Sequence, residues 1–227
     1  MSVNVYKVGG CIRDKLLGRQ NNDIDYAIET ESYDRMKEHI NINYKILYEK
    51  PEFQTIKAKD VNNKVFDFVL CRKESKYLDS RHPSIVQVGT IEDDLSRRDF
   101  TINALAEDKN GKILDYFGGL NDLNSKLLKT VQNTKQCFAD DSLRILRAMR
   151  FCITLKFNLH EDIIQNLHDE KMINGLDNVS LDRIVVELNK CLSLSVIDTL
   201  NFLCTYKELS EYLFNRRKIV VLSKKTE

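Results

Sequence analysis

The chain has 227 residues, enough for one large domain or two small ones. Hydrophobic residues make up 42% of it and charged residues 30%, the balance of an ordinary soluble globular protein. The net charge of +1 gives no overall field typical of nucleic-acid binding, although basic side chains can still gather in one cleft. No apolar run approaches the roughly 20 residues that span a bilayer, and residues 1–7 lack the apolar core of a secretory signal. We therefore expect no membrane association.

The cysteines indicate a reducing compartment. They are widely spaced, most have apolar neighbours, and no C-x-x-C pair occurs; they are Cys11, Cys71, Cys137, Cys152, Cys191 and Cys204. This spacing argues against a zinc ribbon and against a dense disulfide framework. We expect reduced, packed thiols and a cytoplasmic location.

The first 138 residues mix strand and helix patterns. In chain order, they predict a strand at 3–8, a helix at 11–17, a strand at 23–28, a helix at 32–40, and strands at 44–48, 53–59 and 64–70. Residues 75–88 lack a period and are predicted to form a loop. A helix at 95–106, an edge strand at 112–115 and a helix at 120–128 follow.

The pattern becomes helical from Asp140 onward. Apolar residues recur there at helical spacing and no strand-like period returns. Helices are predicted from Leu143 and over 160–168, 180–192, 196–204 and 208–214. We therefore divide the chain into a head domain, 1–138, and a helical domain, 139–227.

Asp23-Ile24-Asp25 is the most informative triplet. In an extended strand the two carboxylates share a face, with Cα atoms roughly 6.6 Å apart, so together they can hold a hard cation such as Mg²⁺ against a phosphate chain. The alternative is two surface aspartates, although Asp is disfavoured in strands. A third acid, Asp67, is predicted to face away from Phe66 and Phe68. It either completes a carboxylate cluster or forms a salt bridge to a nearby Lys or Arg.

Gly9-Gly10 precedes a predicted helix, where free backbone N–H groups favour anions such as triphosphate oxygens. Most Gly-Gly pairs mark plain turns, so this signal alone is weak. The P-loop pattern and the G-x-G-x-x-G pattern are both absent. A P-loop is therefore excluded, and a dinucleotide site is not expected.

Two further clusters combine charges with helical spacing. In the first, 97–105, Arg97 and Arg98 can pair with phosphates and Asp99 can accept a hydrogen bond from a ribose hydroxyl. In the second, 140–147, Asp141 and Arg144 can read the edge of a base, because one accepts and the other donates. The alternatives are a helix start with a solvated basic pair and a salt bridge on a solvated helix face.

The ordered set of motifs resembles the class II CCA-adding tRNA nucleotidyltransferase and bacterial poly(A) polymerase family. The motifs are Gly9-Gly10-x-x-Arg13-Asp14, Asp23-Ile24-Asp25, Arg97-Arg98-Asp99, Asp115-x-x-Gly118-Gly119-x-x-Asp122-Leu123 and Asp140-Asp141-x-x-Arg144-x-x-Arg147. Residues 179–188 look like the family's fifth motif, with Asp182 where Glu is usual, and Asp140 also stands where Glu is commoner. The resemblance reaches to about residue 205.

The resemblance implies an α+β fold: a nucleotidyltransferase head with a mixed sheet, of the DNA polymerase β-like superfamily, followed by an all-helical neck. It implies catalytic carboxylates at Asp23, Asp25 and Asp67, with Mg²⁺, or Mn²⁺ in its place, on Asp23 and Asp25. It places nucleotide contacts at Gly9, Gly10, Arg13, Arg98, Asp99, Asn103, Asp141, Arg144 and Arg147. Within this set, Gly9, Gly10 and Arg13 form the triphosphate turn, and Asp141 and Arg144 select the base.

The implied activity is template-independent addition of C and A from CTP and ATP to an RNA 3′ end, with tRNA as the expected acceptor. Residues 73–83 resemble the loop that lets such enzymes switch from C to A addition. Three alternatives stay open: a poly(A) polymerase using ATP alone, a minimal enzyme acting on a small non-tRNA acceptor, and an inactive RNA- or nucleotide-binding protein.

Length is the main departure from that family. Its bacterial members continue through further helical domains that grip tRNA, and this chain is expected to lack them. Its basic end either contacts RNA phosphate or frays in solvent; the residues are Arg216, Arg217, Lys218, Lys224 and Lys225. The sequence does not fix an oligomeric state.

Overall fold

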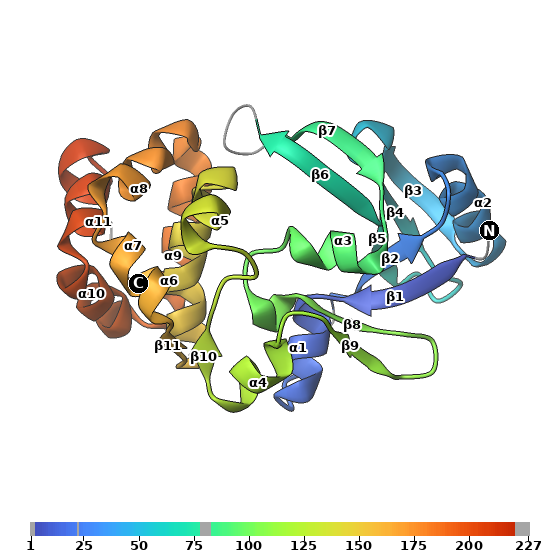
Figure 1. Ribbon diagram of the computed structural model, residues 1–227, viewed down its shortest axis with the longest axis horizontal. Coiled ribbons are helices and arrows are strands. Elements are labelled where there is room, and N and C mark those ends of the chain that lie inside the picture. The colour runs from blue at the N-terminus through green and yellow to red at the C-terminus, as the bar shows by residue number, and fades with distance from the viewer. Residues whose placement is uncertain (1–2, 22, 78–82, 221–227) are drawn as a thin grey trace, which may run out of the picture. The chain divides into compact units, whose positions relative to one another are not determined.

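The computed structural model describes residues 3–21, 23–77 and 83–220. The chain divides into two compact units (Figure 1). The first comprises Met1–Lys76 with Pro83–Ser125, and the second comprises Tyr77–His82 with Lys126–Glu227. We call them the head and the helical unit. Packing thus changes at Ser125, while the domain boundary near residue 138 stays a prediction.

A mixed 7-stranded sheet forms the head, with strand order β3-β4-β5-β2-β1-β8-β9. Strands β2 and β5 pair in parallel, and the other neighbouring strands of this sheet pair antiparallel over the described residues. The strands are β1 (Asn4–Val8), β2 (Asp25–Glu29), β3 (Lys45–Lys50), β4 (Thr55–Lys59), β5 (Val65–Leu70), β8 (Leu105–Glu107) and β9 (Ile113–Asp115). The predicted α+β class and mixed sheet are confirmed.

Helix α2 (Tyr33–Asn43) packs on one face of this sheet (Figure 1). Its Met36 and Ile40 meet the inward side chains of the strands in one apolar core, among them Phe66 and Phe68. Strand β5 alternates buried and exposed residues, as the sequence predicted, so Asp67 lies on the opposite face. The apolar alternation therefore fixes which face of the sheet carries the acids.

Three predictions in the first 138 residues are wrong. The helix predicted at 120–128 ends at Asn124, and Leu127–Leu128 forms a short strand instead. Residues 75–88 are not a plain loop, because β6 (Arg72–Tyr77) and β7 (Pro83–Val88) pair with each other. The single helix predicted at 95–106 is replaced by α3 (Ile91–Ser96), a 3₁₀ turn (Thr101–Asn103) and β8. Helix α3 starts earlier because Thr90 and Asp93 form a capping box. The extended backbone of Phe100 then separates α3 from the 3₁₀ turn.

The other helices of the head are short. They are α1 (Gly10–Leu16), a 3₁₀ turn (Pro51–Phe53) and α4 (Gly119–Asn124). Gly119 lies against the 3₁₀ turn of residues 101–103, and a Cβ at this position would come within 2.3 Å of the Thr101 carbonyl oxygen. The Thr101 hydroxyl donates to Asp122 at 2.5 Å. The motif at 115–123 therefore supports the segment that carries Asp99 and Asn103.

The helical unit consists almost entirely of helices. They are α5 (Thr134–Asp140), α6 (Leu143–Leu155), α7 (Glu161–Leu167), α8 (Glu170–Asn174), a 3₁₀ turn (Gly175–Asn178), α9 (Leu181–Leu194), α10 (Val196–Thr205), α11 (Lys207–Glu211) and a π-helical turn (Tyr212–Arg216). The predicted helices are present, while α5 and α8 were missed. A short parallel pair, β10 (Leu127–Leu128) with β11 (Asn158–Leu159), contradicts the expectation of no further strand. Two-residue strands are too short to show a period.

Helices α6 and α9 pack side by side in this unit (Figure 1). The apolar residues that predicted α6 are buried: Leu143, Leu146, Met149 and Ile153. Arg150 of α6 donates to the buried Glu187 of α9 at 2.6 Å. Within the described residues, no helix has the length and apolar character to cross a membrane.

Candidate active site

Three carboxylates of the head influence one another: those of Asp23, Asp25 and Asp67. Asp25 begins β2 and is the direct neighbour of Asp67 on β5 and of Val8 on β1. Asp23 lies two residues before Asp25, outside β2 rather than within a strand as the sequence predicted, and it is exposed. Partial burial raises the pKa of Asp25 above its ordinary value, and the charges of Asp67 and Asp23 add to this rise while Arg98 opposes it. A bound cation would favour the ionised form of Asp25 and so offset this rise.

Asp67 also has a protein partner. Lys57 of β4 donates to its carboxylate at 2.8 Å, and both side chains are about half exposed. This contact is the salt bridge that the sequence left open as one of two alternatives. In the described part of the chain, no three His, Cys, Asp or Glu side chains converge as a metal-binding group. The catalytic role of Asp67 stays a prediction.

Gly9 forms a turn that only glycine accommodates easily. Its φ of +76° is in the left-handed region, and a Cβ there would lie 2.7 Å from Nη1 of Arg98. Its N–H donates to the Leu105 carbonyl at 3.1 Å, which ties the turn to β8. Gly10 differs, because a Cβ at that position would make only an ordinary contact with Arg13 at 3.5 Å.

Arg98 is held beside this turn by a buried acid. Its Nη2 donates to Asp94 at 3.1 Å and its Nη1 donates to the Asn103 carbonyl at 3.4 Å. Burial alone would raise the pKa of Asp94, but the guanidinium groups of Arg97 and Arg98 outweigh it and lower that pKa. The Nε of Arg98 is buried and has no hydrogen-bond partner in the described structure.

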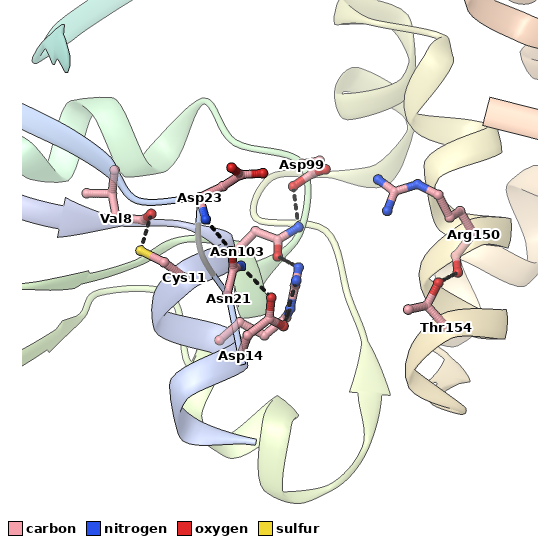
Figure 2. A network of polar contacts seen from close by, with 10 residues as sticks. Val8, Cys11, Asp14, Asn21, Asp23, Asp99, Asn103, Arg150 and Thr154 are labelled. Atoms are coloured by element: carbon pink, nitrogen blue, oxygen red, sulfur yellow. Dashed lines mark hydrogen bonds and ion pairs between the residues drawn. The ribbon is translucent and has the colours of Figure 1, made fainter. Parts of the chain in front are cut away.

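Arg13, Asn103 and Asp99 belong to one hydrogen-bond network, of which Figure 2 shows the bond between Asn103 and Asp99. Arg13 donates through Nη1 to Asn103 at 2.6 Å and through Nε to Asp14 at 2.8 Å. Asn103 donates in turn to Asp99 at 3.0 Å. Arg13 was predicted to bind the triphosphate directly, but its guanidinium is largely engaged within the protein. Its nucleotide contact stays a prediction.

The base-selecting residues belong to the helical unit. Asp141 precedes α6 and accepts from the Leu143 N–H at 3.1 Å and from Arg183 of α9 at 3.4 Å. Arg144 donates to the Cys137 carbonyl at 3.3 Å. Both are partly exposed, as is Arg147, whose guanidinium lies 5.5 Å from the Phe151 ring centroid. Their roles in binding a nucleotide stay predictions.

Asp140 and the basic end are tied into the protein. Asp140 is buried and accepts from Gln136 at 2.6 Å. Arg216 pairs with Asp177 and donates to Asn174 at 2.7 Å. Arg217 donates to the Val179 carbonyl at 3.1 Å. These contacts argue against a frayed end at residues 216–217, while Lys224 and Lys225 lie outside the described residues.

The sequence did not single out Asn21 and Asp94, and it quoted Asp14 only as part of a motif. All three hold candidate site residues: Asp94 binds Arg98, and Asp14 and Asn21 lie in the network of Arg13. Asp94 ends the acidic run Glu92-Asp93-Asp94, which resembles an ordinary helix start. Its position four residues before Arg98 on a short helix was the available signal.

Residues 5–129 match the family model described as the poly A polymerase head domain. Among curated relatives, the CCA-adding enzyme of Streptococcus gordonii is 39% identical over 82% of this chain and 45% of its own length. That of Bacillus subtilis is 34% identical over 96% of this chain and 54% of its own. The chain therefore spans about half the length of the curated relatives it matches.

Solved structures give the same result. The Thermotoga maritima CCA-adding enzyme complexed with tRNA has a TM-score of 0.78 at 27% identity, over 94% of this chain and 49% of its own. A complex of a CCA-adding enzyme with CTP has a TM-score of 0.77 at 27% identity, over 94% of this chain and 48% of that one. The head and the helical unit therefore have the fold of these enzymes.

Proposed function

The chain belongs to the poly A polymerase head domain family, and from this membership we propose that it is a metal-dependent nucleotidyltransferase that adds C and A to a tRNA 3′ end. One observation carries the proposal. A row of carboxylates, with the pKa of Asp25 raised, occurs in the same unit as a strained glycine turn and an arginine with a free buried donor. This combination suits a cation and a triphosphate.

The carboxylates fit Mg²⁺, or Mn²⁺ in its place. Mg²⁺ in phosphate-handling sites usually binds one or two protein carboxylates and fills its other positions with substrate phosphates and water. We assign Asp23 and Asp25 as those carboxylates, because Asp67 already pairs with Lys57. The bound ion would polarise the α-phosphate and acidify the attacking hydroxyl.

The remaining head residues would hold the nucleotide. We assign the phosphates to the turn at Gly9 and Gly10 and to the Nε of Arg98. We assign the ribose to Asp99 and Asn103, whose buried network fixes their side chains. The RNA 3′-hydroxyl then attacks the α-phosphorus, the new P–O bond forms, and pyrophosphate leaves. Positioning and charge supply most of the rate in such reactions.

The base would be selected in the helical unit. We assign this role to Asp141 and Arg144, because one accepts and the other donates hydrogen bonds and both reach solvent. The proposed substrates are CTP and ATP, and the proposed acceptor is tRNA, since the relatives are CCA-adding enzymes and one was solved with tRNA. The free cysteines support a cytoplasmic location.

The test is incubation with each nucleotide, and with CTP and ATP together, on a tRNA that ends before CCA. The proposal expects three added residues with the mixture, visible on a sequencing gel. A long tail with ATP alone would instead make the chain a poly(A) polymerase, an activity that the family's own name favours. No incorporation with any nucleotide, on this RNA or on a short oligonucleotide, would contradict the proposal.

A further inference from the structure

Asp23 lies outside the hydrogen-bond ladder of the sheet. Strand β2 begins at Asp25, and the β1–β2 ladder ends at the Val8–Asp25 pair. The backbone N–H of Asp23 donates to Oδ1 of Asn21 at 2.9 Å. The sheet therefore fixes Asp25, while Asn21 holds the backbone of Asp23.

The other end of the Asn21 amide is anchored in the head. Its Nδ2 donates to Oδ2 of Asp14 at 2.7 Å (Figure 2). One amide thus accepts from a backbone N–H and donates to a carboxylate, and only one orientation of the group satisfies both bonds. Asp14 belongs to α1, so this contact ties the segment before β2 to the helix that follows the glycine turn.

Asp14 in turn belongs to the rigid buried network. Its carboxylate accepts from Arg13, which reaches Asn103 and through it Asp99. Asp14, Asn103 and Asp99 are 9%, 6% and 6% exposed. A satisfied polar network at such burial holds its members in one arrangement. A chain of hydrogen bonds therefore runs from Asp99 to the backbone of Asp23.

We propose that Asn21 is a positioning residue, which holds the Asp23 carboxylate where it can share a cation with Asp25. The inference rests on the proposed function, because it takes Asp23 and Asp25 as the cation ligands. Asn21 itself does not touch the cation. Without the amide of Asn21, Asp23 would keep its charge but lose its fixed direction. Each cation-binding event would then have to order the Asp23 carboxylate, at a cost in conformational entropy that lowers the affinity.

The expected consequence is a higher metal requirement. Groups that orient metal ligands typically contribute about 10- to 100-fold to affinity or activity. For Asn21→Ala we expect the Mg²⁺ concentration for half-maximal CTP incorporation to rise about 10-fold. We expect the rate at saturating Mg²⁺ to recover to within about threefold, because the ligands themselves remain. The thermal unfolding midpoint should stay close to that of the wild type.

Exchanging the amide of Asn21 and the carboxylate of Asp14 distinguishes a positioning role from the simple loss of a side chain. Asn21→Asp alone sets a second carboxylate against Asp14, and the repulsion should raise the Mg²⁺ requirement at least as much as Asn21→Ala does. In the double variant Asp14→Asn/Asn21→Asp, a donor and an acceptor face each other again. We expect this double variant to recover part of the lost Mg²⁺ affinity.

The experiment compares these variants with Asn41→Ala, an exposed asparagine of α2 in the same head. Mn²⁺ binding to the nucleotide-free protein, followed by the EPR signal of the free ion, gives a readout besides activity. Asp25→Ala is the negative control, because it lacks one of the two proposed cation ligands. We expect Asn21→Ala to weaken the Mn²⁺ binding that Asp25→Ala removes, and Asn41→Ala to match the wild type.

Each outcome is decisive. If the wild type incorporates nucleotides and binds Mn²⁺ through Asp25, but Asn21→Ala matches it in both assays, the role of Asn21 is overturned and the proposed function stands. An equal loss of rate at limiting and at saturating Mg²⁺, with a lowered unfolding midpoint, would make Asn21 merely structural and also overturn the inference. A wild type with no incorporation and no Asp25-dependent Mn²⁺ binding would overturn both proposals.

Discussion

The exposed carboxylates of the head and the buried Glu187 at the α6–α9 contact of the helical unit differ in how neighbouring charges act on them. In the helical unit, burial alone would raise the pKa of Glu187, but hydrogen bonds from Lys190 and Arg150 outweigh it and lower that pKa. In the head, Arg98 and Lys57 do not reverse the raised pKa of Asp25. Glu187 has two cationic partners, as expected of a structural contact, whereas the raised pKa of Asp25 near two further acids is what we expect of a candidate binding site.

The comparison predicts its largest effect at Asp25. Asp25→Ala should reduce nucleotide incorporation to background, because it removes a cation ligand. The fold should not suffer, since the substitution also removes like-charge repulsion. Incorporation of labelled CTP and ATP, with circular dichroism as the folding control, checks both parts. Full activity in Asp25→Ala would show that Asp25 is not a catalytic residue.

Arg144 tests whether the helical unit also contributes to function. A good bidentate contact between a side chain and a base is worth about 1–3 kcal/mol of discrimination. Arg144→Ala should therefore reduce the preference for CTP and ATP over GTP and UTP by about 10- to 100-fold. The kcat/KM for each nucleotide measures this. Unchanged selectivity in Arg144→Ala would remove the base-reading role.

Substitution of Glu187 tests whether the ion pairs of this buried carboxylate stabilise the fold without contributing to activity. Glu187→Ala leaves Arg150 and Lys190 without their shared acceptor, so it should lower the free energy of unfolding by about 2 kcal/mol. Nucleotide incorporation per folded molecule should hold. Urea unfolding measures the first quantity, and an activity loss larger than the loss of folded protein would contradict a purely structural role.

Within the head, substitutions at Gly9 and Gly10 should differ in their effect on stability. Gly9→Ala forces a left-handed backbone and a clash with Arg98, so it should cost about 1–2 kcal/mol of stability. Gly10→Ala meets only ordinary contacts and should leave stability nearly unchanged. Urea unfolding of both variants checks this contrast, and equal losses would show that the turn at Gly9 is not specially constrained.

The smallest expected effect is in the pH dependence. The lowered pKa of Glu187 adds stability above its ordinary value of 4.5, and this stability is lost as pH falls through the lowered pKa. The raised pKa of Asp25 acts in the opposite sense, because its ionisation destabilises the fold as pH rises above 3.8. On acidification, the advantage of the wild type over Glu187→Gln should shrink. The advantage of Asp25→Asn over the wild type should grow as pH rises.

Urea unfolding between about pH 3.5 and about pH 7 measures both trends. The two quantities are the stability of the wild type minus that of Glu187→Gln, and the stability of the wild type minus that of Asp25→Asn. If both change in the same direction with pH, the pKa values of Glu187 and Asp25 are not shifted in opposite directions. The comparison would then lose its electrostatic basis.

The sequence predicted what depends on local pattern. Alternation placed Phe66 and Phe68 opposite Asp67, and helical spacing predicted α6 from its apolar residues. It misplaced the helix at 95–106 because the capping box at Thr90 is a better start signal than the apolar residues that follow. Local patterns therefore fixed most elements, and tertiary contacts fixed the rest.

The candidate site was only partly predictable for the same reason. Its motif residues were found, but the partner of Arg13 lies 90 residues away at Asn103, and no local period reveals that contact. Asn21 gave no signal at all, since an asparagine near a turn is common. Asp67 gave an ambiguous one, because a carboxylate facing away from the core suits either a cation or a lysine.

The most direct test of the proposed cation site is the anomalous scattering of Mn²⁺ in crystals grown with a nonreactive ATP analogue. We expect an anomalous peak for an ion coordinated by the carboxylates of Asp23 and Asp25, about 2.0–2.6 Å from their oxygens. In crystals of Asp25→Ala this peak should disappear. Mn²⁺ and analogue bound with neither carboxylate as a ligand would contradict the account.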